Sequence, residues 1–103
     1  MTVERTYIAH QTRYALRDGP ALRCVLAFDT GPGGEGPAEW KILLAGPAAT
    51  VDRYDAHEFV RPDAAQLTAW LTPILGPDAA TELVTAVDAD PPHSADWHRM
   101  TNG

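Results

Sequence analysis

Residues 6–28 read TYIAHQTRYALRDGPALRCVLAF, and this stretch decides the fold. From Thr6 to Leu16 aromatic and β-branched residues recur at alternate positions, which is typical of a half-buried strand. One face of this predicted strand carries Thr6, Ile8, His10, Thr12, Tyr14 and Leu16. Asp18-Gly19 then favours a hairpin turn, because glycine tolerates positive φ. A second strand follows, and its predicted inward face carries Leu22, Cys24, Leu26 and Phe28.

The chain continues through a loop and further extended segments. Residues 31–37 contain four glycines and two prolines, a density that no regular element tolerates. The loop matches the letters of a dinucleotide-binding fingerprint, but that motif must lead into a helix, and here a strand is predicted to follow. We therefore interpret it as a plain loop. The strand is predicted at residues 39–45, and an edge strand or irregular extended segment at residues 49–60.

The second half of the chain has the pattern of two helices. Asp63 is the predicted N-cap of the first, and Gly76-Pro77 separates it from the second. Pro73 predicts a kink in the first helix or a restart after Thr72. Two apolar stripes have helical spacing: Leu67, Trp70, Leu71, Ile74 and Leu75, then Ala80, Leu83, Val84 and Val87.

Strands grouped before helices predict an α+β fold. We expect an antiparallel sheet of three to four strands, followed by two C-terminal helices packed on one face. Residues 1–92 form the single predicted domain, and residues 93–103 form a polar C-terminal tail.

The net charge of −6 is unevenly distributed. Residues 1–49 carry five basic and five acidic residues, whereas residues 50–103 carry three arginines and nine acidic residues. An acidic half repels phosphate backbones, so nucleic-acid binding is disfavoured. The same half is suited to a basic protein surface, although acidic residues also simply keep small proteins in solution.

Other features of the sequence set the cellular context. There is one cysteine, no N-terminal signal-peptide pattern and no apolar run long enough to cross a bilayer, so we expect a cytoplasmic protein without membrane contacts. Abundant arginine and alanine are typical of proteins encoded by bacterial genomes with a high GC content, so the sequence favours a host of that kind. No spacing of histidine, cysteine and carboxylate residues is typical of a metal site, and no motif predicts a cofactor.

Residues 53–58 form the densest polar cluster. In an extended segment Arg53, Asp55 and His57 share one face, and a carboxylate beside an imidazole is a minimal acid–base pair. Asp55, His57 and Tyr54 are therefore the candidate catalytic residues, with Arg53 as an anion-binding residue. The competing interpretation is a charged edge strand that resists edge-to-edge pairing.

Two further groups of residues are candidates for binding. Arg13, Arg17 and Arg23 are predicted to form a basic strip that binds an anionic ligand, or a solvated face. Trp97 in the polar tail is a candidate interface residue, because large aromatic side chains in polar segments usually dock onto a surface, here either the core of their own domain or a second subunit. Glu58 is the acidic candidate at that interface.

Three functional hypotheses follow. The first is a small acidic protein-interaction module, such as an inhibitor, an immunity or antitoxin-like protein or an accessory subunit, that binds a basic partner. The second is a small enzyme or small-molecule binder with a pocket between sheet and helices and with Asp55 and His57 as its acid–base pair. The third is a homodimer formed through the edge strand and Trp97.

Overall fold

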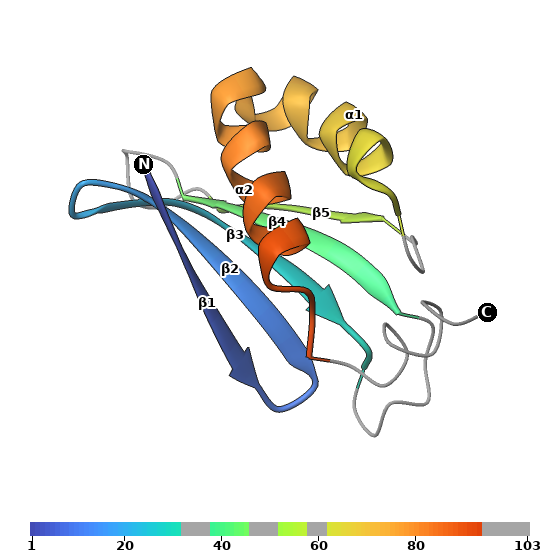
Figure 1. The fold of residues 1–103 in the computed structure, drawn as a ribbon. Helices are drawn as coiled ribbons and strands as arrows, with labels where there is room; N and C mark the ends of the chain where they lie inside the picture. The colour runs from blue at the N-terminus through green and yellow to red at the C-terminus, as the bar shows by residue number, and fades with distance from the viewer. Residues whose placement is uncertain (32–37, 46–51, 58–61, 94–103) are drawn as a thin grey trace.

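The structure is a computed structural model in which residues 1–31, 38–45, 52–57 and 62–93 are described, the side chains of residues 52–55 excepted. The elements are β1 (Thr2–Ile8), β2 (Gln11–Asp18), β3 (Ala21–Asp29), β4 (Glu39–Ala45), β5 (Asp52–His57), α1 (Ala64–Leu75) and α2 (Pro77–Ala89) (Figure 1). The strands pair antiparallel in chain order, with β1 and β5 at the edges. Both helices lie on one side of the sheet (Figure 1).

The α+β class, the edge strand within residues 49–60 and the two C-terminal helices are confirmed. The predicted count of three to four strands is wrong, because the described residues form five. The stretch from Thr6 to Leu16 is not one strand. Ala9 and His10 form a tight turn that joins β1 to β2, and Ala9 takes a φ of 55° to close it.

The turn also changes which residues share a face. The register sets Tyr7 opposite Thr12 and Arg5 opposite Tyr14, and residues directly opposite each other in an antiparallel pair share a face. Ile8 therefore lies on the other face from Tyr14 and is 52% exposed, contrary to the predicted alternation. Turns of this type usually carry Asn-Gly or Asp-Gly, so Ala9-His10 gives no sequence signal.

A bulge in β3 corrects a second prediction. Leu16 pairs with Cys24, but Arg17 pairs with Leu22, so Arg23 is an extra residue in the ladder. Leu22 consequently leaves the inward face and is 38% exposed, whereas Cys24 is fully buried. The inward face of β3 therefore begins at Cys24.

The core lies between the sheet and the helix layer. Its largest buried side chains come from the three central strands and include Tyr14, Phe28 and Trp40. The Phe28 and Trp40 rings lie 5.1 Å apart and tilted, an arrangement that aromatic pairs prefer. From the helices the core receives Leu67, Leu71, Ala79, Ala80, Leu83, Val84 and Val87, which belong to or adjoin the predicted stripes.

The helix ends follow the predicted signals. Asp63 caps α1 with a capping box, in which its carboxylate accepts from the Gln66 backbone N–H and the Gln66 side chain accepts from the Asp63 backbone N–H. Gly76, at a φ of 90°, separates the helices and Pro77 opens α2. Pro73 lies inside α1, which nevertheless continues to Leu75, so the predicted restart does not occur.

Two sheet side chains hold the C-terminal end of α2. The buried Tyr14 hydroxyl donates to the Asp90 carbonyl at 2.7 Å. Arg5 Nη2 donates to the Pro91 carbonyl at 2.7 Å, and Arg5 Nε lies 3.6 Å from Asp90 Oδ1. Burial raises the pKa of Tyr14 to about 12, although Arg5 opposes this, so the hydroxyl keeps the proton that it donates. These bonds tie the C-cap of α2 and the residue after it to the sheet.

The chain stays against the sheet beyond α2. The His93 backbone N–H donates to Oγ1 of the buried Thr12 at 2.9 Å, and the His93 ring lies 4.3 Å from the Tyr7 ring. His93 is the only residue of the predicted tail that the structure describes.

Replacing Tyr14 with Phe removes the bond to Asp90 while the ring still fills its site. The free energy of unfolding should fall by about 1–3 kcal/mol, because the buried carbonyl loses its donor. Urea unfolding followed by circular dichroism measures this change. Tyr7→Phe is the matched control: Tyr7 is 49% exposed, and its change should stay within about 0.5 kcal/mol. Equal effects of the two changes would contradict the anchoring role of Tyr14.

Candidate functional site

The helix layer carries charge of one sign. Neither α1 nor α2 contains a lysine or arginine, and every charged side chain in residues 62–93 is acidic. Asp78, Glu82 and Asp88 are exposed on α2; we call these three residues the α2 acidic face. In the described part of the chain, Asp90 is ion-paired with Arg5, whereas no member of the α2 acidic face forms an ion pair. Five of the nine acidic residues of the predicted acidic half therefore lie within residues 62–93.

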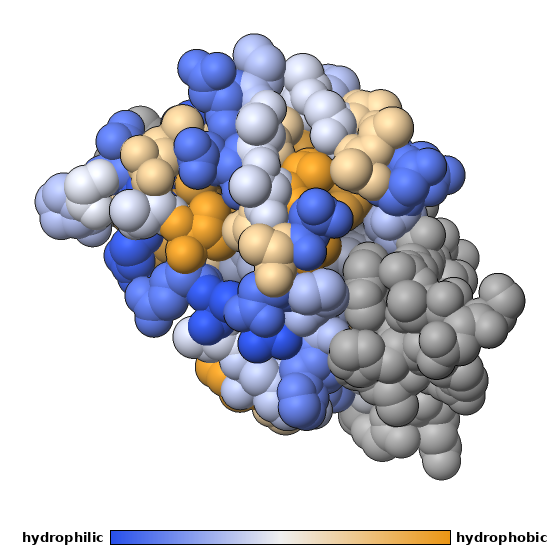
Figure 2. Space-filling model, viewed as in Figure 1, coloured by the Kyte–Doolittle hydropathy of each residue, from blue (hydrophilic) through white to orange (hydrophobic). Residues whose placement is uncertain are grey.

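A groove lies between the two helices. Its volume is about 400 Å³, and it extends from the start of α1 to the end of α2. The lining residues are Pro62, Asp63, Ala64, Leu67, Val84, Val87, Asp88 and Pro91. Figure 2 views the helix layer and shows hydrophobic side chains gathered between the helices, with hydrophilic residues around them. We call this feature the α1–α2 groove.

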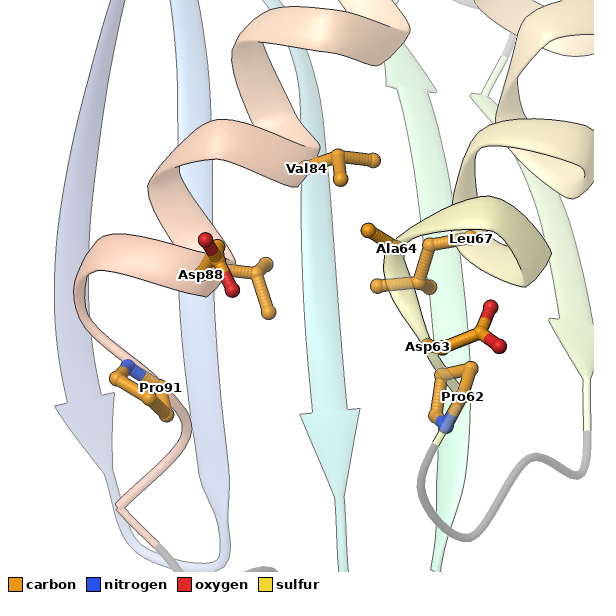
Figure 3. Close-up of a pocket in the computed structure, with 8 residues that line it drawn as sticks. Pro62, Asp63, Ala64, Leu67, Val84, Asp88 and Pro91 are labelled. Atoms are coloured by element: carbon orange, nitrogen blue, oxygen red, sulfur yellow. The ribbon is translucent and has the colours of Figure 1, made fainter.

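Two carboxylates flank the α1–α2 groove. Asp63 stands at the start of α1 and Asp88 near the end of α2, on opposite sides of the cavity (Figure 3). Ala64, Leu67 and Val84 lie between them and make the floor apolar (Figure 3). The groove can therefore hold an apolar group, with the Asp88 carboxylate at its α2 edge, while the Asp63 carboxylate caps α1 and points away from Asp88 (Figure 3).

Asp88 is unfavourably placed for the helix that carries it. It lies in the last turn of α2, which contains no basic residue, and carbonyl dipoles make that end of a helix negative. Asp78 and Glu82 are four residues apart, a spacing at which like charges repel. The repulsion between Asp78 and Glu82 lowers the stability of the fold by a few tenths of a kcal/mol. The position of Asp88 at the negative end of the helix lowers it by a few tenths to about 1 kcal/mol.

The predicted catalytic residues lie on β5. The ladder pairs Arg53 with Leu44, Asp55 with Ile42 and His57 with Trp40, so these positions belong to the helix face of the sheet. Tyr54 pairs with Leu43 on the opposite face.

His57 is exposed, and its ring lies 5.4 Å from that of Trp70 on α1. The side chains of residues 52–55 are outside the described set, so the acid–base pairing stays a prediction. Of the two β5 residues whose side chains are described, Ala56 and His57, neither lines the α1–α2 groove. Glu58 and Trp97, the predicted interface residues, also lie outside the described residues.

The predicted arginine strip lies on the face of the sheet away from the helices. Arg13 and Arg17 line one shallow depression of about 200 Å³, and Arg13 also lines a neighbouring one of about 210 Å³. Arg23 lines neither depression, and its Nη1 lies 3.3 Å from the Met1 sulfur. The structure thus brings two of the three predicted residues together.

Asp29 is a polar centre that the sequence analysis missed. It lies at the end of β3, is 4% exposed, and accepts hydrogen bonds from the Lys41 side chain, the Gly31 backbone N–H and the Gln11 side chain at 2.8–2.9 Å. His10 Nε2 is 3.3 Å from Asp29 Oδ1. Burial raises the pKa of Asp29, but the bonds from Lys41, Gly31 and Gln11 outweigh it and lower the pKa below 3.8. Gln11 pairs directly with Asp29 across the β2–β3 ladder, a register that becomes known only with the structure.

Other chemistry finds little support in the described residues. Burial raises the pKa of the Cys24 thiol to about 11, against a small opposing effect of Arg23, so a reactive thiolate is disfavoured. The described residues contain no group of three or more potential metal ligands. Within the described chain neither helix has the length and apolar character needed to cross a membrane.

The Asp29 cluster predicts a pH dependence of stability. Because the folded pKa is lowered, the stabilisation is present above the ordinary carboxyl pKa of 3.8 and is lost as the pH falls through the folded value. Asp29→Asn should lower the free energy of unfolding by roughly 1–3 kcal/mol at pH 7. The difference in free energy of unfolding between this variant and the parent protein should become smaller below pH 4. Urea titrations between pH 7 and pH 3 measure it.

The exposed Asp18 provides the control for that series. Asp18→Asn should change stability by less than about 0.5 kcal/mol at pH 7. If the difference in free energy of unfolding between Asp29→Asn and the parent stayed constant down to pH 3, the stabilising role of the charged Asp29 carboxylate would be refuted.

The comparisons with known proteins do not assign this site. No protein-family model, no curated protein sequence and no solved structure matches the chain. The functional argument therefore depends on the acidic helix layer and the α1–α2 groove.

Proposed function

We propose that the protein is a small interaction module whose helix layer binds a basic surface of a protein partner. The observation that carries the proposal is the charge of residues 62–93, where every charged side chain is acidic and the α2 acidic face has no ion-pair partner in the described chain. An inhibitor, an immunity or antitoxin-like protein and an accessory subunit all act in this way. A surface of one sign speeds the encounter with an oppositely charged partner.

The energetics of α2 support this proposal. The repulsion between Asp78 and Glu82, and the position of Asp88 at the negative end of the helix, both act against folding. Natural proteins depart from local stability rules mostly where function requires it. Basic side chains of a partner would reverse the sign of both effects, because they would place positive charge beside each carboxylate.

The proposed setting is the cytoplasm of a bacterium. Cys24 is a free, buried thiol, as suits a reducing compartment. The arginine- and alanine-rich composition agrees with a high-GC bacterial host. The proposed partner is therefore a cytoplasmic protein with a basic surface.

Neutralising two acids of the α2 acidic face tests the proposal. The tagged protein and its Asp78→Asn, Glu82→Gln double variant are used to capture partners from host lysate at low and high salt, followed by mass spectrometry. A stoichiometric basic protein should be captured at low salt and lost at high salt, because exposed ion pairs are screened. Its affinity for the purified double variant should be about two- to thirtyfold weaker, at about 0.2–1 kcal/mol for each exposed pair.

The matched control removes two charges from elsewhere in the molecule. The Glu4→Gln, Asp18→Asn double variant makes the same change in net charge, and both residues are exposed on the first two strands. It should bind the partner as the parent does. Equal weakening by both double variants would show that only net charge matters and would refute the helix layer as the interface.

A further inference from the structure

We infer that the α1–α2 groove is the anchor site of the proposed interface and that it receives an apolar side chain of the partner flanked by arginine or lysine. This inference depends on the proposed function and adds the chemistry of the segment that is recognised. The groove is a cavity of about 400 Å³ with two carboxylates at its edges. Its volume is about twice that of either depression on the opposite face of the sheet.

The lining of the groove defines the anchor. Apart from Asp63 and Asp88, the lining residues that the structure describes are all apolar: Pro62, Ala64, Leu67, Val84, Val87 and Pro91. Its volume is near the lower end of the range of about 300–1,000 Å³ that is usual for ligand pockets. This space suits one large apolar side chain or two small ones, and interfaces obtain most of their affinity from such anchors in central pockets.

The carboxylates define the residues beside the anchor. Asp63 and Asp88 line opposite sides of the cavity, so a segment with an apolar residue in the groove passes both residues. The Asp63 carboxylate caps α1 through the Gln66 backbone N–H and points away from Asp88 (Figure 3). Asp88 has no ion pair in the described chain. A basic side chain beside the anchor complements the Asp88 carboxylate, and a second one is attracted by the acidic helix layer.

The sheet face away from the helices is a weaker candidate. Its two depressions are about half as large. One is lined by the basic residues Arg13 and Lys41, and Lys41 is already paired with Asp29 and Glu39. The other is lined by charges of both signs, Glu4, Arg13 and Arg17. The α1–α2 groove is the surface whose shape and charge agree on one occupant.

Filling the groove is the direct test. Ala64 is exposed, lines the groove and opens α1, so Ala64→Met adds a side chain into the cavity at a position that tolerates methionine. The next residue, Ala65, is also exposed and on the same helix but does not line the groove, so Ala65→Met is the matched control. Circular dichroism confirms that both variants fold.

The probe is a synthetic ten-residue peptide with a central leucine, an arginine on each side of it, and alanine and glycine elsewhere. Binding is followed by nuclear magnetic resonance, through the backbone amides of Leu67, Val84 and Val87. Ala64→Met should weaken binding at least about tenfold, the loss expected when a leucine anchor is no longer buried, and Ala65→Met should leave it unchanged. A peptide with alanine in place of leucine should bind the parent at least tenfold more weakly.

Asp88→Asn separates binding from folding. It should weaken peptide binding by about two- to fivefold, the range for one exposed ion pair. It should also raise the melting temperature, since it removes a negative charge from the C-terminal end of α2. A purely structural role of Asp88 would give a lower melting temperature together with weaker binding, which would count against the proposal.

The outcomes separate this inference from the proposed function. Salt-sensitive peptide binding that Ala64→Met leaves intact would overturn the groove and keep the acidic helix layer as the interface. An absence of salt-sensitive binding to the parent would overturn both. Nuclear Overhauser contacts between the groove and residues 94–103 in the free protein would assign the groove to the chain's own C-terminal segment and would also overturn the inference.

Discussion

The hydrogen bond from Tyr14 to the Asp90 carbonyl determines how the helix layer sits on the sheet. Tyr14 is fully buried in the middle of β2, and its hydroxyl donates to the carbonyl of Asp90, the residue that caps the C-terminal end of α2. Arg5 on the neighbouring strand donates to the next carbonyl, that of Pro91. Because both bonds end on the backbone, they fix the position of α2 whatever side chains its outer face carries. The exposed face of that helix is therefore free to carry an acid such as Asp88 that opposes the helix dipole.

Most of the fold could be predicted because local signals agree with the tertiary structure. Asp63 predicts the start of α1, Gly76-Pro77 predicts the break between the helices, and alternation predicts the central strands. The two errors come from the backbone. The Ala9-His10 turn lacks the glycine that usually marks a tight hairpin turn. The bulge at Arg23 shifts the strand register by one residue, and nothing in the local sequence indicates it. Because of these two errors, Ile8 was predicted on the same face as Tyr14 and Leu22 on the same face as Cys24, although each lies on the opposite face of the sheet.

The candidate site was predictable in charge and not in shape. Counting residues places the negative charge in the second half, but the α1–α2 groove arises only when the start of α1 and the end of α2 are set side by side (Figure 3). Its lining residues Leu67 and Val84 are ordinary members of helical apolar stripes in the sequence. The Asp29 centre was hidden for a related reason, since its partners Gln11, Gly31 and Lys41 come from three separate segments of the chain.

The position of Asp88 bears on whether the acidic surface serves to bind a partner or only to keep the protein in solution. If the acids only kept the protein in solution, any exposed position would serve, and selection would favour positions that do not oppose a helix dipole. Asp88 instead lies at the negative end of α2, at the edge of an apolar groove and across it from Asp63. The cost to the helix is small against a typical stability of about 5–15 kcal/mol, so the fold tolerates it. A binding role explains both the unfavourable position and the neighbouring cavity, whereas solubility explains neither.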